Sequence, residues 1–149
     1  MTSLVFCCHF AATWYMTGLC WLVQRVQYPL MEQVGVERFA AYEAAHVTRI
    51  GPVVAPVMLL EMGTALALLT WGGLAFRNSL FLLSLVFLVG IWLSTFGIQV
   101  PLHAQLAHGF DADAHARLVR SNWIRTVFWT IRGLFLIVML HFFGVRVLG

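Results

Sequence analysis

Residues 50–71 read IGPVVAPVMLLEMGTALALLTW, an apolar stretch that contains a single charged residue, Glu61. A run of about 18 or more apolar residues is long enough to cross the hydrocarbon core of a bilayer as a helix. A charge in the middle of such a helix is costly in lipid, so it normally faces other helices and finds a partner there. The stretch therefore predicts a membrane helix that turns Glu61 towards the interior of a bundle.

Three further stretches have the same character, and together they predict four spans at roughly residues 4–24, 50–71, 80–106 and 123–147. The first and third contain no Asp, Glu, Lys or Arg, whereas the fourth carries Arg125 and Arg132. Only 10% of the 149 residues are charged and 61% are hydrophobic, whereas soluble proteins average about 25% charged residues. We therefore expect one domain, residues 1–149, folded as an all-α integral membrane four-helix bundle.

The connection between the first two spans carries a helical pattern of its own. Phe39, Tyr42 and His46 lie at i, i+3 and i+7, which places them on one face of a helix, and Gly51-Pro52 follows as a break. This pattern predicts a short amphipathic helix at the membrane interface. A linker helix packed under the bundle would give the same pattern.

Two helix boundaries can also be predicted. Tyr28-Pro29 should end the first helix, because the residue before a proline is biased away from helical geometry. Gly109-Phe110-Asp111 indicates a helix stop followed by an aspartate N-cap for the last helix.

Orientation follows from the arginines, since all nine basic residues are Arg. Most of them lie in the connections at one end of the bundle: Arg25, Arg38, Arg49, Arg117 and Arg120, with Arg125 just inside. The opposite end has Arg77 and Arg146. The positive-inside rule therefore predicts a multi-pass protein of the cell membrane, with the arginine-rich connections in the cytoplasm and both termini outside. The net charge of +3 then suits anionic lipid headgroups of the bilayer, and no pattern suggests a nucleic-acid partner.

Each span carries polar residues at helical spacing along one face, and lipid-facing polar stripes would be unfavourable, so all four stripes should turn inward. The stripes include Thr13, Thr17, Trp21, Gln24 and Tyr28; Glu61 and Thr64; Thr95, Gln99 and His103; Asn122, Arg125, Trp129 and Arg132. Glu61 and Arg132 lie about 18 and 15 Å from the same interface along their helices, so they reach similar depth. We predict a buried Glu61–Arg132 ion pair, which would hold the bundle in register or form the floor of a pocket.

The histidines raise the question of a metal or haem. His46 and His103, on different helices in the arginine-rich half, are the pair that would ligate one. Interfacial histidines are commonly polar anchors, however, and we expect no cofactor. His103 continues the stripe of Thr95 and Gln99, and a histidine titrates near neutral pH, so it is a candidate base.

The second half of the chain resembles a known family. Val100-Pro101-Leu102 with Leu106, followed by Asn122-Trp123-Ile124-Arg125, is similar to the pattern of the anthrone-oxygenase-like membrane family. The resemblance covers the third and fourth helices and implies a small four-helix membrane fold. Some fungal members oxidise anthrones to anthraquinones without an obvious metal. Where that family often has a small polar residue after the Pro-Leu pair, this chain has His103.

These observations favour a membrane enzyme, of oxygenase or oxidoreductase type, acting on a hydrophobic aromatic or quinone-like molecule inside the bundle. His103 would be the base, Arg125 or Arg132 would stabilise negative charge on oxygen, and Glu61 would partner Arg132. The remaining contacts to the ligand would come from Gln24, Gln99, Asn122, Trp21, Trp123 and Trp129.

Two alternatives stay open. The protein could be a non-enzymatic subunit or scaffold of a larger membrane complex, or a haem- or metal-binding membrane protein. A homo-oligomer is compatible with each of these functions.

Overall fold

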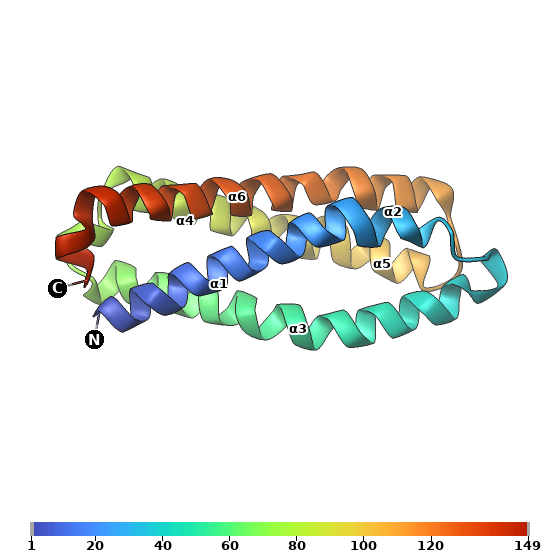
Figure 1. Ribbon diagram of the computed structural model, residues 1–149. Helices are drawn as coiled ribbons and strands as arrows, with labels where there is room; N and C mark the ends of the chain where they lie inside the picture. The colour runs from blue at the N-terminus through green and yellow to red at the C-terminus, as the bar shows by residue number, and fades with distance from the viewer. Residues whose placement is uncertain (1, 149) are drawn as a thin grey trace.

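The computed structural model describes residues 2–148, and side chains as far as Phe142. Within that range every long element is a helix and there is no β-strand. Four helical rods run along one another (Figure 1), and each is long and apolar enough to cross a membrane: Thr2–Met31, Val36–Trp71, Ser79–Leu106 and Ala112–Phe142. The expected all-α four-helix architecture is confirmed. The side chain of Arg146, which entered the orientation argument, lies outside the described part.

The rods are built from the following elements. The first comprises α1 (Thr2–Leu22), the wide turn η1 (Val23–Gln27) and α2 (Tyr28–Met31), and the second is α3 (Val36–Trp71). A short turn, η2 (Leu74–Phe76), leads to the third rod, which comprises α4 (Ser79–Ser94), η3 (Thr95–Gln99) and α5 (Val100–Leu106). The fourth is α6 (Ala112–Leu148). Both ends of the chain lie at the same end of the bundle (Figure 1).

The first rod continues through its proline by widening one turn. The backbone N–H of Tyr28 donates to the carbonyl of Val23, five residues back instead of four. Pro29 has no N–H to offer the preceding turn, and such a wide turn accommodates the missing donor. The prediction that Tyr28-Pro29 ends the first helix is therefore wrong, because the helix runs on to Met31.

A second wide turn occurs in the third rod, where Val100 N–H donates to the carbonyl of Thr95 just before Pro101. The surrounding sequences repeat as well: Val26-Gln27-Tyr28-Pro29-Leu30 matches Ile98-Gln99-Val100-Pro101-Leu102. Each of these stretches is followed by one long helix, α3 or α6. The bundle therefore has two similar halves, α1–α3 and α4–α6, a relationship that the sequence analysis did not detect.

The segment expected to form a separate interfacial helix is the first part of α3 instead. α3 runs without interruption through Pro52 and Pro56, so the predicted break at Gly51-Pro52 is wrong. Apolar helices tolerate prolines where neighbouring groups satisfy the freed backbone. Phe39, which we placed on one face of the interfacial helix, is fully buried and packs edge-on against Phe110 at 5.0 Å between ring centroids. Protein contacts therefore hold this segment in line with the rest of the helix.

The N-cap of α6 is present as predicted. The carboxylate of Asp111 accepts hydrogen bonds from the backbone N–H of Ala114 (2.9 Å) and from the Gln105 side chain (2.7 Å). The bond from Ala114 is the main reason that the pKa of Asp111 lies below its usual value. Gly109, with φ 141°, ends the preceding helix in a conformation that glycine adopts readily.

The four rods do not pack evenly. α1 lies closely along both α3 and α6, and α4 lies closely along α6. α3, by contrast, approaches α5 only over a short stretch and hardly meets α4. The bundle has four interfaces between neighbouring rods, which we call seams. The seam between α3 and the third rod is open, and it contains the candidate site.

Candidate functional site

A cavity of about 680 Å³ fills the open seam between α3 and the third rod, with α1 behind it. Its wall is mostly apolar and includes Met16, Leu19, Cys20, Val23, Val54, Met58, Leu59, Trp92 and Phe96. The polar residues of the lining are Tyr28, His46, Thr48, Thr95, Gln99, His103 and Arg125. The chamber is therefore suited to a hydrophobic molecule that also carries a polar group.

The cavity opens sideways, between two helices. Exposed side chains form its rim, with Val47 and Leu59 on α3 facing Phe96 and Val100 on the third rod. The corresponding seam of the other half, between α1 and α6, is closed by close packing. The two halves of the bundle therefore differ at the seam that contains the cavity.

Arg125 supplies a positive charge to the lining. Only 9% of this residue is exposed. Its guanidinium donates to Asn122 Oδ1 through Nε (3.0 Å) and Nη2 (2.7 Å), and to Thr95 Oγ1 through Nη1 (3.5 Å). No carboxylate of the described residues forms an ion pair with it. Burial without a counter-charge makes Arg125 an attractive site for an anionic or electron-rich oxygen.

His103 belongs to a chain of three hydrogen-bonded groups. Its Nδ1 lies 2.5 Å from Oε1 of the fully buried Glu43, and its Nε2 lies 3.0 Å from the hydroxyl of Tyr28. With Glu43 ionised, Nδ1–H donates to the carboxylate and Nε2 accepts from the tyrosine hydroxyl. His103 and Tyr28 both line the cavity, so a proton can pass between the phenol and the imidazole at its wall.

Sequence analysis did not single out Glu43 or Trp92. Glu43 precedes His46 by three residues on one helix, a spacing that places both on one face and could have drawn attention to it. Within the described residues, Glu43 Oε2 and Trp92 Nε1 are buried without a hydrogen-bond partner. Trp92 lies in the cavity wall, so its N–H is an unused donor beside the chamber.

The predicted ion pair between Glu61 and Arg132 is present, and both residues are fully buried. Glu61 also accepts from Thr13 Oγ1 (2.7 Å) and Trp129 Nε1 (2.9 Å). Arg132 donates through Nε to the backbone carbonyl of Ser84 (3.1 Å). Neither Glu61 nor Arg132 lines the cavity. The pair is thus a closed polar centre within the bundle, separate from the chamber that holds Arg125 and His103.

The three predicted amide side chains have different roles. Gln24 Oε1 accepts from Asn122 Nδ2 (2.9 Å), and Asn122 in turn holds the guanidinium of Arg125. Gln24 and Asn122 therefore support Arg125 from behind without lining the cavity. Gln99 does line it, while its side chain bonds to Ser94 (3.0 Å).

The predicted tryptophans lie elsewhere. Trp21 and Trp123 pack edge-to-face at 5.5 Å and are 40% and 37% exposed, on α1 and α6. Trp129 is buried and donates to Glu61. The structure brings none of these three residues to the cavity, whose lining includes the aromatic side chains of Tyr28, Trp92 and Phe96.

The two histidines considered as ligands lie close together, with ring centroids 5.5 Å apart. Glu43 and Tyr28 already occupy both nitrogens of His103, so it would have to release one of them to bind a metal. Among the described residues there is no group of three or more His, Cys, Asp or Glu side chains that could hold a metal ion. The hydrogen bonds of His103 therefore hold it within a network of protein groups.

No family model, curated protein or solved structure matches this chain. The cavity and the residues that line it are therefore the main indication of function.

Proposed function

We propose that the protein is inserted in the cell membrane through its four long helices, with the arginine-rich end in the cytoplasm and both termini outside. The length and composition of the helices support insertion. The ends of the chain lie together at one end of the bundle (Figure 1). Five exposed arginines lie near the connections at the other end: Arg25, Arg38, Arg49, Arg117 and Arg120.

In this setting the protein acts as an enzyme on a hydrophobic aromatic or quinone-like molecule bound in the cavity. The observation that carries this proposal is Arg125, a buried cation that lines a mostly apolar chamber and has no carboxylate partner among the described residues. A volume of about 680 Å³ suits a drug-sized molecule, since ligand cavities commonly span roughly 300–1,000 Å³. The lateral opening gives such a molecule a route in from the lipid.

The site residues are suited to proton transfer at an oxygen. Tyr28 exchanges a proton with the ligand, His103 takes it up or returns it, and Glu43 keeps the imidazole in the required tautomer. Arg125 stabilises the negative charge that forms on the ligand oxygen. The resemblance to the anthrone-oxygenase-like family implies the same substrate class, with oxidation of the anion by an acceptor such as dioxygen.

A scaffold subunit would be expected to pair its interior polar groups with one another and to leave no chamber. The Glu61–Arg132 centre has that character, but the cavity beside Arg125 does not. The presence of a lateral opening that leads to His103 and Arg125 therefore favours the enzyme over the scaffold.

The first test is purification in mild detergent, followed by mass spectrometry of extracted small molecules. Anthrone and a short-chain quinone are then titrated against the protein while tryptophan fluorescence is followed, because Trp92 lines the cavity. We expect saturable binding that Arg125→Gln weakens and that Arg77→Gln, an exposed arginine at the opposite end, leaves unchanged. A protein that carries no aromatic molecule and binds neither probe would overturn the proposal and favour the complex subunit.

A further inference from the structure

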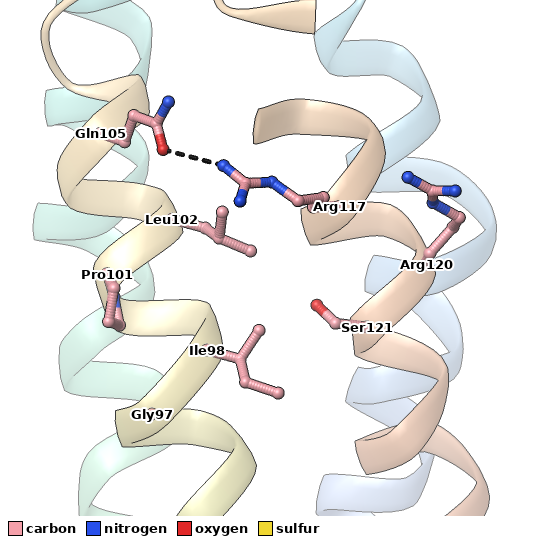
Figure 2. A pocket seen from close by; sticks show the side chains of 8 residues that line it. All are labelled: Gly97, Ile98, Pro101, Leu102, Gln105, Arg117, Arg120 and Ser121. Atoms are coloured by element: carbon pink, nitrogen blue, oxygen red, sulfur yellow. Dashed lines mark hydrogen bonds between the residues drawn. The ribbon is translucent and has the colours of Figure 1, made fainter. Parts of the chain in front are cut away.

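A second hollow, of about 550 Å³, lies between α5 and α6 and shares no lining residue with the cavity. Eight residues line it: Gly97, Ile98, Pro101, Leu102, Gln105, Arg117, Arg120 and Ser121 (Figure 2). We call it the α5–α6 groove.

Polarity changes along this groove in one direction. Figure 2 shows Gln105 and Arg117 at the end nearest the connection between α5 and α6, and Ile98 and Gly97 at the opposite end. Leu102 lies between them. The groove therefore runs from a polar, cationic mouth towards a mainly apolar inner part, where Ser121 lies beside Ile98, in the direction of the helix axes.

Arg117 lies near the carboxylate of Asp111, which accepts a hydrogen bond from Gln105 and whose pKa Arg117 helps to lower, but the two do not form an ion pair. Arg117 Nη2 donates to Gln105 Oε1 across the groove (3.2 Å), and Arg120 Nε donates to the carbonyl of Ala116 (3.3 Å). Neither guanidinium forms an ion pair with a carboxylate in the part of the chain that the structure describes. Both residues are exposed, so their remaining donors are available to an external anion.

We propose that the α5–α6 groove binds one anionic phospholipid, with its phosphate at Arg117, additional positive charge from Arg120 on the next turn of α6, and an acyl chain lying against Leu102 and Ile98. Guanidinium groups suit phosphate oxygens because they donate two parallel hydrogen bonds. Basic pockets between membrane helices on the cytoplasmic side are typical headgroup sites. The order of polarity along the groove is that of a lipid whose head lies at the membrane surface. This inference rests on the membrane insertion proposed above and is independent of the ligand cavity.

Room for the acyl chain comes from the glycine at the inner end. A Cβ built on Gly97 would meet no atom within 4 Å, so the groove is open there. A larger side chain at this position would fill the space that is open to the acyl chain, and it would not clash with the protein. Gly97→Leu therefore removes the channel while the arginines stay in place.

The test uses the full chain in detergent supplemented with phosphatidylglycerol or phosphatidylcholine, and native mass spectrometry counts retained lipid. We expect one phosphatidylglycerol to be retained in preference to phosphatidylcholine. Replacing both arginines, Arg117→Gln with Arg120→Gln, should weaken retention by at least about tenfold, the effect of about one charge-assisted hydrogen bond. Gly97→Leu should weaken it too.

Arg77→Gln is the matched control, since it removes an exposed arginine at the other end of the bundle. Equal retention of both lipids, or equal loss in the Arg77 control, would overturn the inference. Displacement of the lipid by millimolar inorganic phosphate would also overturn it, because the site would then recognise the phosphate alone. Arg125→Gln should leave lipid retention intact, which separates this test from that of the cavity.

Discussion

Glu43 Oε1 lies 2.5 Å from His103 Nδ1, in a hydrogen bond that joins α3 to α5. These two helices otherwise approach each other only over a short stretch. The bond therefore has two consequences: it ties together the two sides of the open seam, and it fixes which nitrogen of His103 faces Tyr28.

Replacing Glu43 with Gln should disturb the tautomer of His103. With an ionised Glu43, Nδ1 carries the proton and Nε2 accepts from Tyr28, whereas an amide at position 43 can offer either an acceptor or a donor. Nitrogen NMR of labelled histidine should show one tautomer in the native protein and a mixture in Glu43→Gln. The exposed carboxylate of Glu37 on the same helix provides the control, and an unchanged spectrum in Glu43→Gln would contradict the assignment.

Replacing Arg125 with Lys tests whether the cation makes a forked contact to the ligand. Lysine keeps the charge but not the planar pair of donors, so we expect anthrone or quinone binding to weaken by about tenfold. The measurement is the fluorescence titration, with Arg25→Lys, an exposed arginine, as the matched control. Equal affinity of native protein and Arg125→Lys would show that charge alone is required.

Removing one partner of the Glu61–Arg132 pair should be strongly destabilising, because the other charge would be left buried and unpaired. We expect Glu61→Gln to lower the free energy of unfolding by about 3–5 kcal/mol. Thermal unfolding in detergent measures the loss, against Glu37→Gln at an exposed site on α3. Replacing both partners with Met should cost less than the sum of the single changes. Additive losses would argue against direct coupling.

A low pH should destabilise the N-terminus of α6, because Asp111 is the N-cap of this helix. The pKa of Asp111 in the folded protein lies below its ordinary value, so its contribution to stability is present above that ordinary value. This contribution is lost as the pH falls through the folded-state pKa. Asp111→Ala should be less stable than the native protein at neutral pH, and the difference should vanish in strong acid. Melting temperatures between pH 7 and pH 2 would show this convergence, and a constant difference would contradict it.

Narrowing the lateral opening should slow ligand entry. Ala55 lies on the rim of the cavity and is exposed, so Ala55→Phe would place a ring across the seam. Stopped-flow fluorescence with anthrone should show a lower association rate with little change in thermal stability. Ala41→Phe, also exposed on α3 but away from the cavity, should bind at the native rate. If both variants bind equally fast, the ligand enters by another route.

The sequence was sufficient for the four long apolar helices and for the Glu61–Arg132 pair, since hydropathy locates apolar helices and the rise per residue fixes how far along each helix a residue lies. It was insufficient for α3, because the burial of Phe39 and Glu43 depends on contacts with other helices. Trp21 shows a further limit. A polar stripe indicates which face turns inward, but a residue at its edge can lie on the outer surface, as Trp21 does.

The two wide turns, η1 and η3, could not be predicted from regular helical periodicity either. A turn closed five residues back contains one more residue than the regular spacing assumes, so it rotates the following residues relative to the expected face. Tyr28 lies just after such a turn and Gln99 lies within one, and both line the cavity. The repeated Gln-x-Pro-Leu sequence was the available signal, and a search for internal repeats would have found it.

Because the two similar halves belong to one chain, a substitution in one half alters one seam and leaves the corresponding seam unchanged. In a symmetric pair of identical two-helix chains, any substitution would alter both seams at once, and improved packing at one would close the other. Covalent linkage removes that constraint. The seam between α1 and α6 is closely packed and supports the molecule, while its counterpart leaves room for a chamber lined by Arg125 and His103.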